Sequence, residues 1–175
     1  MFIETPKALS SDFCWCSYNI FSTQDHIVAS IAHAGSAAVF SRKGESLEEY
    51  WDCILNDLIW PEDDGKGHRP ELIVYDGGHM TLLVYEGKKA EYLFLKDVTI
   101  PDPSSMENDE FKIVQTIIKR QLEGGEIDKW NKIVNTCMGV SEKTSTGVHH
   151  IYTMEKTGTN HQTWERKMTE AMCAK

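Results

Sequence analysis

Long apolar runs and basic clusters are both missing from this sequence. No stretch approaches the ~18 consecutive apolar residues of a membrane-spanning helix. The first residues also lack the basic region and apolar run of a secretory signal peptide. With 18 Lys and Arg against 27 Asp and Glu, the formal net charge is −9, and no dense Lys/Arg stripe is present. We therefore expect neither a membrane nor a nucleic acid as partner.

The sequence also lacks a disulfide framework. Its five cysteines are an odd number at irregular spacing, which indicates a reducing, cytoplasmic setting. Cys14 and Cys16 could begin a metal site, but no second Cys/His pair at ligand spacing completes it. We expect strand thiols here and no bound metal. The apolar share of 41% in 175 residues suits one ordinary hydrophobic core.

Short strands alternate with helices along the chain. We expect strands at 13–20, 37–40, 72–75 and 137–140. Helices are expected after Ser22, after Ser46, after Gly78, around 111–122 and after Gly147, with a short amphipathic helix at 164–172. The strongest of these signals is the Ser46/Glu49 capping box ahead of an apolar face. The alternation predicts an α/β fold, an open and mostly parallel sheet with helices on its faces.

Such sheets bind ligands beyond the carboxyl ends of their strands, and three polar clusters fall there: 19–25, 76–79 and 141–146. Asp76 precedes two glycines and could bind a sugar hydroxyl or transfer a proton. The alternative is that Asp76 only caps the next helix. The hydroxyls of the third cluster could bind a hydroxylated ligand or phosphate, or could serve as ordinary caps.

Four motifs, in this order, resemble the adenosylhomocysteinase family. They are NIFSTQDH (19–26), KGESLEEYW (43–51), YDGG (75–78) and GVSEKTSTGV (139–148). The segment at about 86–129, with its Pro-Asp-Pro loop, resembles the helical insertion of the family's longer subtype. The resemblance implies a flavodoxin/Rossmann-like substrate-binding domain.

The resemblance further implies the NAD-dependent hydrolysis of S-adenosyl-L-homocysteine to adenosine and L-homocysteine, in one-carbon metabolism. Asp76 matches a catalytic and substrate-binding carboxylate of the family, and Asn19 matches a substrate-binding position. Lys143 stands where the family has a Glu that binds the ribose hydroxyls, so it replaces an acceptor by a donor. Lys143 would pair with Asp76 if their strands were neighbours. The hydroxyls that match NAD contacts belong to Thr144, Ser145 and Thr146.

Other parts of the family pattern have no counterpart here. They are an upstream Leu-His-Met-Thr motif, a downstream Lys and Asp, and the Gly-x-Gly-x-x-Gly domain for NAD. We therefore expect 1–175 to form one partial substrate-binding domain without an NAD-binding domain and with a diverged tail at 160–175. We expect this chain alone to be inactive and to bind NAD weakly. The alternatives are a non-catalytic subunit, self-associating or joined to full-length enzyme, and a non-functional gene fragment.

Overall fold

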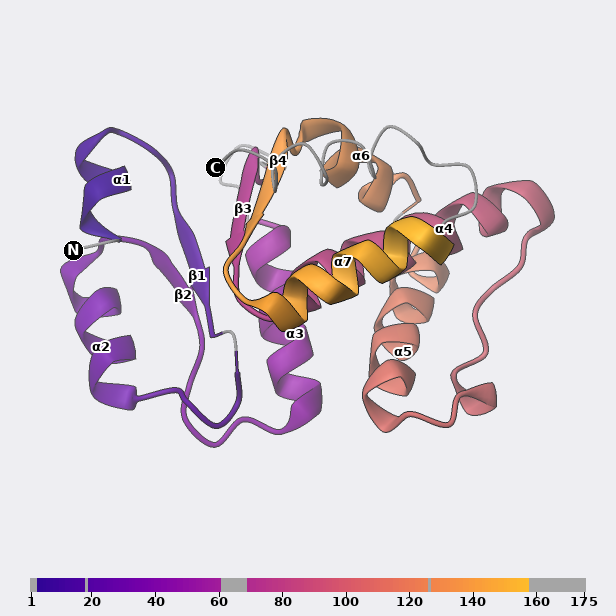
Figure 1. The fold of residues 1–175 in the computed structure, drawn as a ribbon, viewed down its shortest axis with the longest axis horizontal. Coiled ribbons are helices and arrows are strands. Elements are labelled where there is room, and N and C mark those ends of the chain that lie inside the picture. The colour runs from indigo at the N-terminus through magenta and orange to yellow at the C-terminus, as the bar shows by residue number, and fades with distance from the viewer. Residues whose placement is uncertain (1–2, 18, 61–68, 126, 158–175) are drawn as a thin grey trace. The chain divides into compact units, whose positions relative to one another are not determined.

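The computed structural model describes residues 3–17, 19–60, 69–125 and 127–157. The chain divides into two compact units, residues 1–68 (unit 1) and 69–175 (unit 2). In the described ranges the strands form two parallel pairs, β1 with β2 in unit 1 and β3 with β4 in unit 2 (Figure 1). The α/β class and the parallel pairing are therefore confirmed. The predicted single partial domain over 1–175 stays a prediction.

The single open sheet is not what the described strands form, because they pair in two separate two-stranded sheets. Each described strand is three or four residues long and is paired along one edge, β1 and β2 in unit 1 and β3 and β4 in unit 2. The strands therefore supply parallel pairs rather than one continuous sheet.

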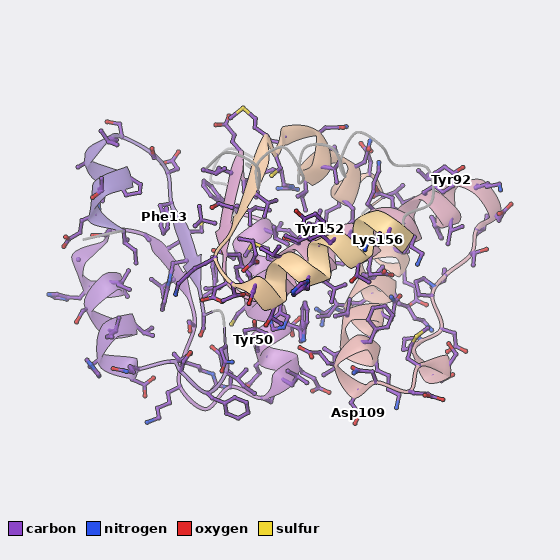
Figure 2. All side chains as sticks on the ribbon, viewed as in Figure 1. Phe13, Tyr50, Tyr92, Asp109, Tyr152 and Lys156 are labelled. Atoms are coloured by element: carbon purple, nitrogen blue, oxygen red, sulfur yellow. The ribbon has the colours of Figure 1, made fainter. Side chains whose placement is uncertain are left out.

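Unit 1 contains α1 (Glu4–Ala8), β1 (Cys14–Cys16), α2 (Asp25–Ala34), β2 (Ala38–Phe40) and α3 (Leu47–Leu58). The helix α3 packs against both strands. Its first turn is closed by the expected capping box, in which the Ser46 side chain accepts from the Glu49 N–H and Glu49 accepts in return. The buried side of α3 consists of Tyr50 (labelled in Figure 2), Trp51, Ile54, Leu55 and Leu58. The predicted amphipathic helix is thus confirmed.

Two predictions at the start of unit 1 were wrong in detail. The strand ends at Cys16 rather than continuing to residue 20. Beyond it the Ser17 hydroxyl donates to the Asn19 carbonyl, so the chain turns instead of pairing. The helix α2 is preceded by Gln24 and not by Ser22, whose hydroxyl also donates to the Asn19 carbonyl. Local side-chain bonds have therefore replaced the expected cap.

Unit 2 contains β3 (Leu72–Tyr75), α4 (His79–Asp97), η1 (Pro103–Ser105), α5 (Asp109–Glu123), α6 (Lys129–Thr136), β4 (Gly139–Glu142) and α7 (Ser145–Thr157). The long helix α4 contacts α5, α6 and α7 and is the centre of this unit. The sequence predicted only the start of α4, after Gly78, and it did not predict α6. Strand β4 begins and ends two residues later than the predicted 137–140, because the Cys137 N–H donates to the Ile133 carbonyl and closes α6. Ser141 and Glu142, predicted to follow this strand, therefore lie within it. The predicted insertion boundary near residue 86 lies inside α4 and stays a prediction.

The packing of α4 on α6 depends on a glycine and a buried carboxylate. At Gly87 an added Cβ would lie 2.3 Å from the Trp130 ring, so only glycine allows this approach. Glu91 on α4 accepts from the backbone N–H groups of Trp130 and Asn131, at 3.3 and 2.8 Å. It thereby caps α6 from another helix. Burial raises the pKa of Glu91, and the two backbone donors oppose that rise.

None of the helices in the described ranges combines the length and the apolar character needed to cross a bilayer. The helix expected at 164–172 lies outside the described residues.

Candidate functional site at the carboxyl ends of β3 and β4

Asp76 and Lys143 meet where the two strands of unit 2 end. The parallel register pairs Tyr75 with Glu142, so the residue that follows each strand faces its counterpart. The Lys143 N–H donates to the Tyr75 carbonyl at 3.1 Å and continues the ladder by one step. The Lys143 ammonium lies 3.4 Å from Asp76 Oδ2. The strand ends are therefore neighbours, and Lys143 pairs with Asp76 as expected for neighbouring strands.

The two partners differ in exposure. The Lys143 side chain is 82% exposed and that of Asp76 is 20% exposed. An exposed ion pair of this kind contributes only about 0–1 kcal/mol, so the ammonium can move aside at little cost. Asp76 does not cap α4, because the N-cap is Gly78 in left-handed conformation and no side-chain cap hydrogen bond forms. The capping alternative for Asp76 is wrong, and its carboxylate pairs with Lys143 beyond the strand ends.

Glu142 holds the centre of the site, although sequence reasoning gave it no role. Its Oε1 accepts from the Gly77 N–H at 2.9 Å, from the Thr144 N–H at 3.0 Å and from the Thr144 hydroxyl at 3.1 Å. Strand alternation could have predicted this role, because residues two apart share a face and Glu142 therefore lies on the same face of β4 as buried Val140. An acidic residue on a core face needs partners, and these three donors all bond Oε1, whereas the buried Oε2 has no hydrogen-bond partner among the described residues.

The hydroxyl cluster divides into one structural residue and two exposed ones. Thr144 precedes α7, and its hydroxyl accepts from the Gly147 N–H at 3.3 Å. With its proton directed to Glu142, this hydroxyl keeps one lone pair for a ligand. The capping alternative therefore holds for Thr144. Ser145 and Thr146 lie exposed in the first turn of α7.

Asn19 is built into a turn of unit 1, whereas the other predicted site residues belong to unit 2. Its Oδ1 accepts from the Phe21 N–H at 2.7 Å, and its carbonyl accepts from the Ser17 hydroxyl at 2.8 Å. The structure thus brings together Asp76, Lys143 and Thr144, and it gives Asn19 a local role in the turn after β1.

The cysteines of β1 behave as strand thiols. Cys16 is buried and Cys14 is partly buried. Burial raises the pKa of Cys14 to about 12 and raises that of Cys16 well above its ordinary value, so both stay protonated. Among the residues that the structure describes, no group of three or more His, Cys, Asp or Glu side chains could hold a metal ion.

Comparison with known proteins identifies the class. The family model for S-adenosyl-L-homocysteine hydrolase matches residues 1–163, so this chain belongs to that family. It is 52% identical over 157 residues to the adenosylhomocysteinase of Triticum aestivum and 51% identical over 156 residues to that of Solanum lycopersicum. These matches cover 90% and 89% of this chain and 31% of each relative. The chain thus spans about a third of the length of these curated relatives.

Proposed function

We propose that unit 2 carries the ribose-binding edge of an adenosylhomocysteinase-type site. In this proposal the edge binds the adenosine part of S-adenosyl-L-homocysteine, which the complete site hydrolyses to adenosine and L-homocysteine. The observation that carries the proposal is the Asp76 carboxylate, partly exposed beyond a parallel strand pair and not used as a helix cap. Ligands of open parallel sheets bind at this position. The complete open sheet with helices on both faces is part of the same proposal.

The chemistry of the two edge residues suits a sugar diol only in part. A carboxylate accepts hydrogen bonds from ribose hydroxyls and can hold a proton during the reaction. The Lys143 ammonium has donors only, so it bonds a hydroxyl oxygen and competes for Asp76 at the same time. We therefore expect adenosine to bind this chain weakly, with Lys143 as the residue that limits the affinity.

For NAD, unit 2 offers one edge of a binding site. The exposed hydroxyls of Ser145 and Thr146 and the remaining lone pair of Thr144 fit the hydroxyl-rich end of a dinucleotide. When bound, NAD⁺ supplies a hydride acceptor for the ribose alcohol. The residues of this chain would bind and orient the cofactor there, with Glu142 and Gly147 holding Thr144 in place.

Titration of adenosine into the full chain tests the proposal. Lys143→Glu restores an acceptor and should tighten binding by about 1–3 kcal/mol, while Asp76→Asn should weaken it by a similar amount. Lys156→Glu makes the same charge change at the far end of α7 (Figure 2) and serves as the matched control. Equal affinities for the parent chain and Lys143→Glu under identical salt would show that this turn does not meet the ribose.

A second function, as a non-catalytic subunit, is favoured by a different observation. Leu72 and Val74 are 61% and 50% exposed on one side of β3, although parallel sheets are usually covered on both faces. Light scattering of the chain mixed with a full-length adenosylhomocysteinase tests this function, and Leu72→Lys should weaken the association. Self-association of the chain alone would indicate a homo-oligomer instead.

A further inference from the structure

Glu142 connects two segments that are distant in sequence. Gly77 lies 65 residues before Glu142, in the loop after β3, and Thr144 lies two residues after it, in the turn after β4. One carboxylate oxygen accepts from both segments. Bonds to a charged acceptor are stronger than those between neutral groups, so these contacts outweigh an exposed ion pair.

The two ligand-facing residues are attached directly to these anchored groups. Asp76 immediately precedes Gly77, and Lys143 lies between Glu142 and Thr144. The exposed Lys143–Asp76 pair is too weakly bound to fix the loops by itself. The position of the Asp76 carboxylate therefore depends on Glu142, which lies partly buried behind the edge.

The backbone conformation at Gly77 makes the Asp76 loop more dependent on Glu142. Its φ of 106° lies in the region that favours glycine. Because glycine has many other backbone conformations open to it, the loop needs an attachment to stay in this one. In that conformation the Gly77 N–H is directed at Glu142 Oε1. Without the carboxylate this partly buried donor would lose its partner, and the loop would lose its attachment to β4.

Gly147 completes the arrangement by leaving room for the carboxylate. A Cβ at this position would lie 2.3 Å from Glu142 Cδ and 2.5 and 2.6 Å from its two oxygens. These separations are far below ordinary contact distances. Gly147 is in the first turn of a helix, where glycine is less stabilising than alanine. The space that it leaves for the carboxylate therefore lowers the stability of α7.

We propose that Glu142 is a positioning residue, seated against Gly147, that fixes the Asp76 loop relative to the Thr144 turn and so sets affinity for a ribose diol. The ligand part of this inference rests on the proposed function. The anchoring part concerns the apo chain and does not depend on it.

Hydrogen exchange at the Gly77 amide, measured by NMR on the full chain, tests the anchoring. Glu142→Ala should raise its exchange rate about tenfold or more, because the amide loses its acceptor. Glu142→Gln keeps an acceptor oxygen and should restore most of the protection. Unchanged Gly77 exchange in Glu142→Ala, with both chains folded by circular dichroism, overturns the inference.

A double-mutant cycle of Gly147→Ala and Glu142→Ala, followed by the urea midpoint of unfolding, gives a second test. A simple loss of packing would not reproduce its expected change of sign. Gly147→Ala should lower the urea midpoint of the parent chain, because its Cβ displaces the carboxylate. In the Glu142→Ala background the same change should raise the midpoint, because only the helix preference for alanine remains. The same sign in both backgrounds contradicts the proposed seat of Glu142.

Adenosine titration separates the two proposals. If Glu142→Ala weakens adenosine binding about tenfold and Glu142→Gln does not, the positioning role extends to the ligand. If neither the parent chain nor Lys143→Glu binds adenosine while Gly77 exchange still responds, the proposed function fails and the anchoring role stands. Adenosine binding that is equal in the parent chain and Glu142→Ala overturns the ligand part.

Discussion

Replacing Gly87 by alanine is expected to destabilise the chain by forcing α4 away from α6. A Cβ at Gly87 would lie 2.3, 2.5 and 2.7 Å from three ring atoms of Trp130. Carbon atoms in good contact are about 3.5–4.0 Å apart, so the ring or the helices must move by more than about 1 Å. Trp130 is fully buried and its backbone N–H donates to Glu91, so the indole has little freedom to move.

Two opposing effects set the magnitude. Overpacking of this kind costs about 1–3 kcal/mol, and the upper end applies where the neighbour is rigid. The helix preference for alanine over glycine returns about 1 kcal/mol. We therefore expect a net loss of about 2 kcal/mol in the free energy of unfolding.

Urea unfolding followed by far-UV circular dichroism measures this loss without depending on the fluorescence of the perturbed tryptophan. The control is the same substitution in a Trp130→Leu background. There the obstructing ring is gone, and Gly87→Ala should be neutral or stabilising. An unchanged or higher midpoint for Gly87→Ala in the parent chain would refute the packing argument.

The remaining predictions concern a cap, a buried acid and the activity of the chain. Ser46→Ala should lower the free energy of unfolding in urea by about 1 kcal/mol, since it removes one half of the capping box of α3. An unchanged free energy would show that the box is dispensable. Burial raises the pKa of Asp57 to about 7, above its unfolded value of about 3.9, so stability should fall as the pH rises through this window, by at most about 4 kcal/mol. Asp57→Asn should flatten that dependence in unfolding curves, and an unchanged slope would assign it to other groups. The chain as given should release no homocysteine and should show no micromolar affinity for NAD in calorimetry. The donor-only Lys143 ammonium stands beside Asp76 where a ribose diol needs an acceptor, and the Thr144 turn offers only one edge of a dinucleotide site. Homocysteine release that depends on Asp76 would contradict this.

Several features of the chain follow from local sequence. The limits of β3 match the predicted strand 72–75, because four apolar residues are bounded there by a turn signal. The helix α3 begins as expected, since its capping box and apolar face lie within a few residues of each other. The family was also readable, because four short motifs occur in the right order and the family model covers them.

The failures lie where interactions are not local. Helix α6 has no side-chain cap of its own and is capped by Glu91, about 40 residues earlier in the chain. Strand β1 ends early because of hydroxyl and amide bonds around Asn19 that the apolar run 13–20 did not reveal. Residue order carries little direct information on such bonds, since each depends on where another element has packed.

The candidate site shows the same division. Sequence alone determined which residues stand at the end of β3 and placed the polar cluster 141–146 near the end of β4, because strand limits and motif spacing are local properties. The end of β4 itself lies two residues later than predicted, at Glu142. Only the tertiary structure decided that Lys143 reaches Asp76, 67 residues away, since this requires the parallel register of two strands. It also decided that Glu142 is seated against Gly147 and that its Oε1 is bonded to Gly77, because the donors to this partly buried carboxylate include one from a segment 65 residues away.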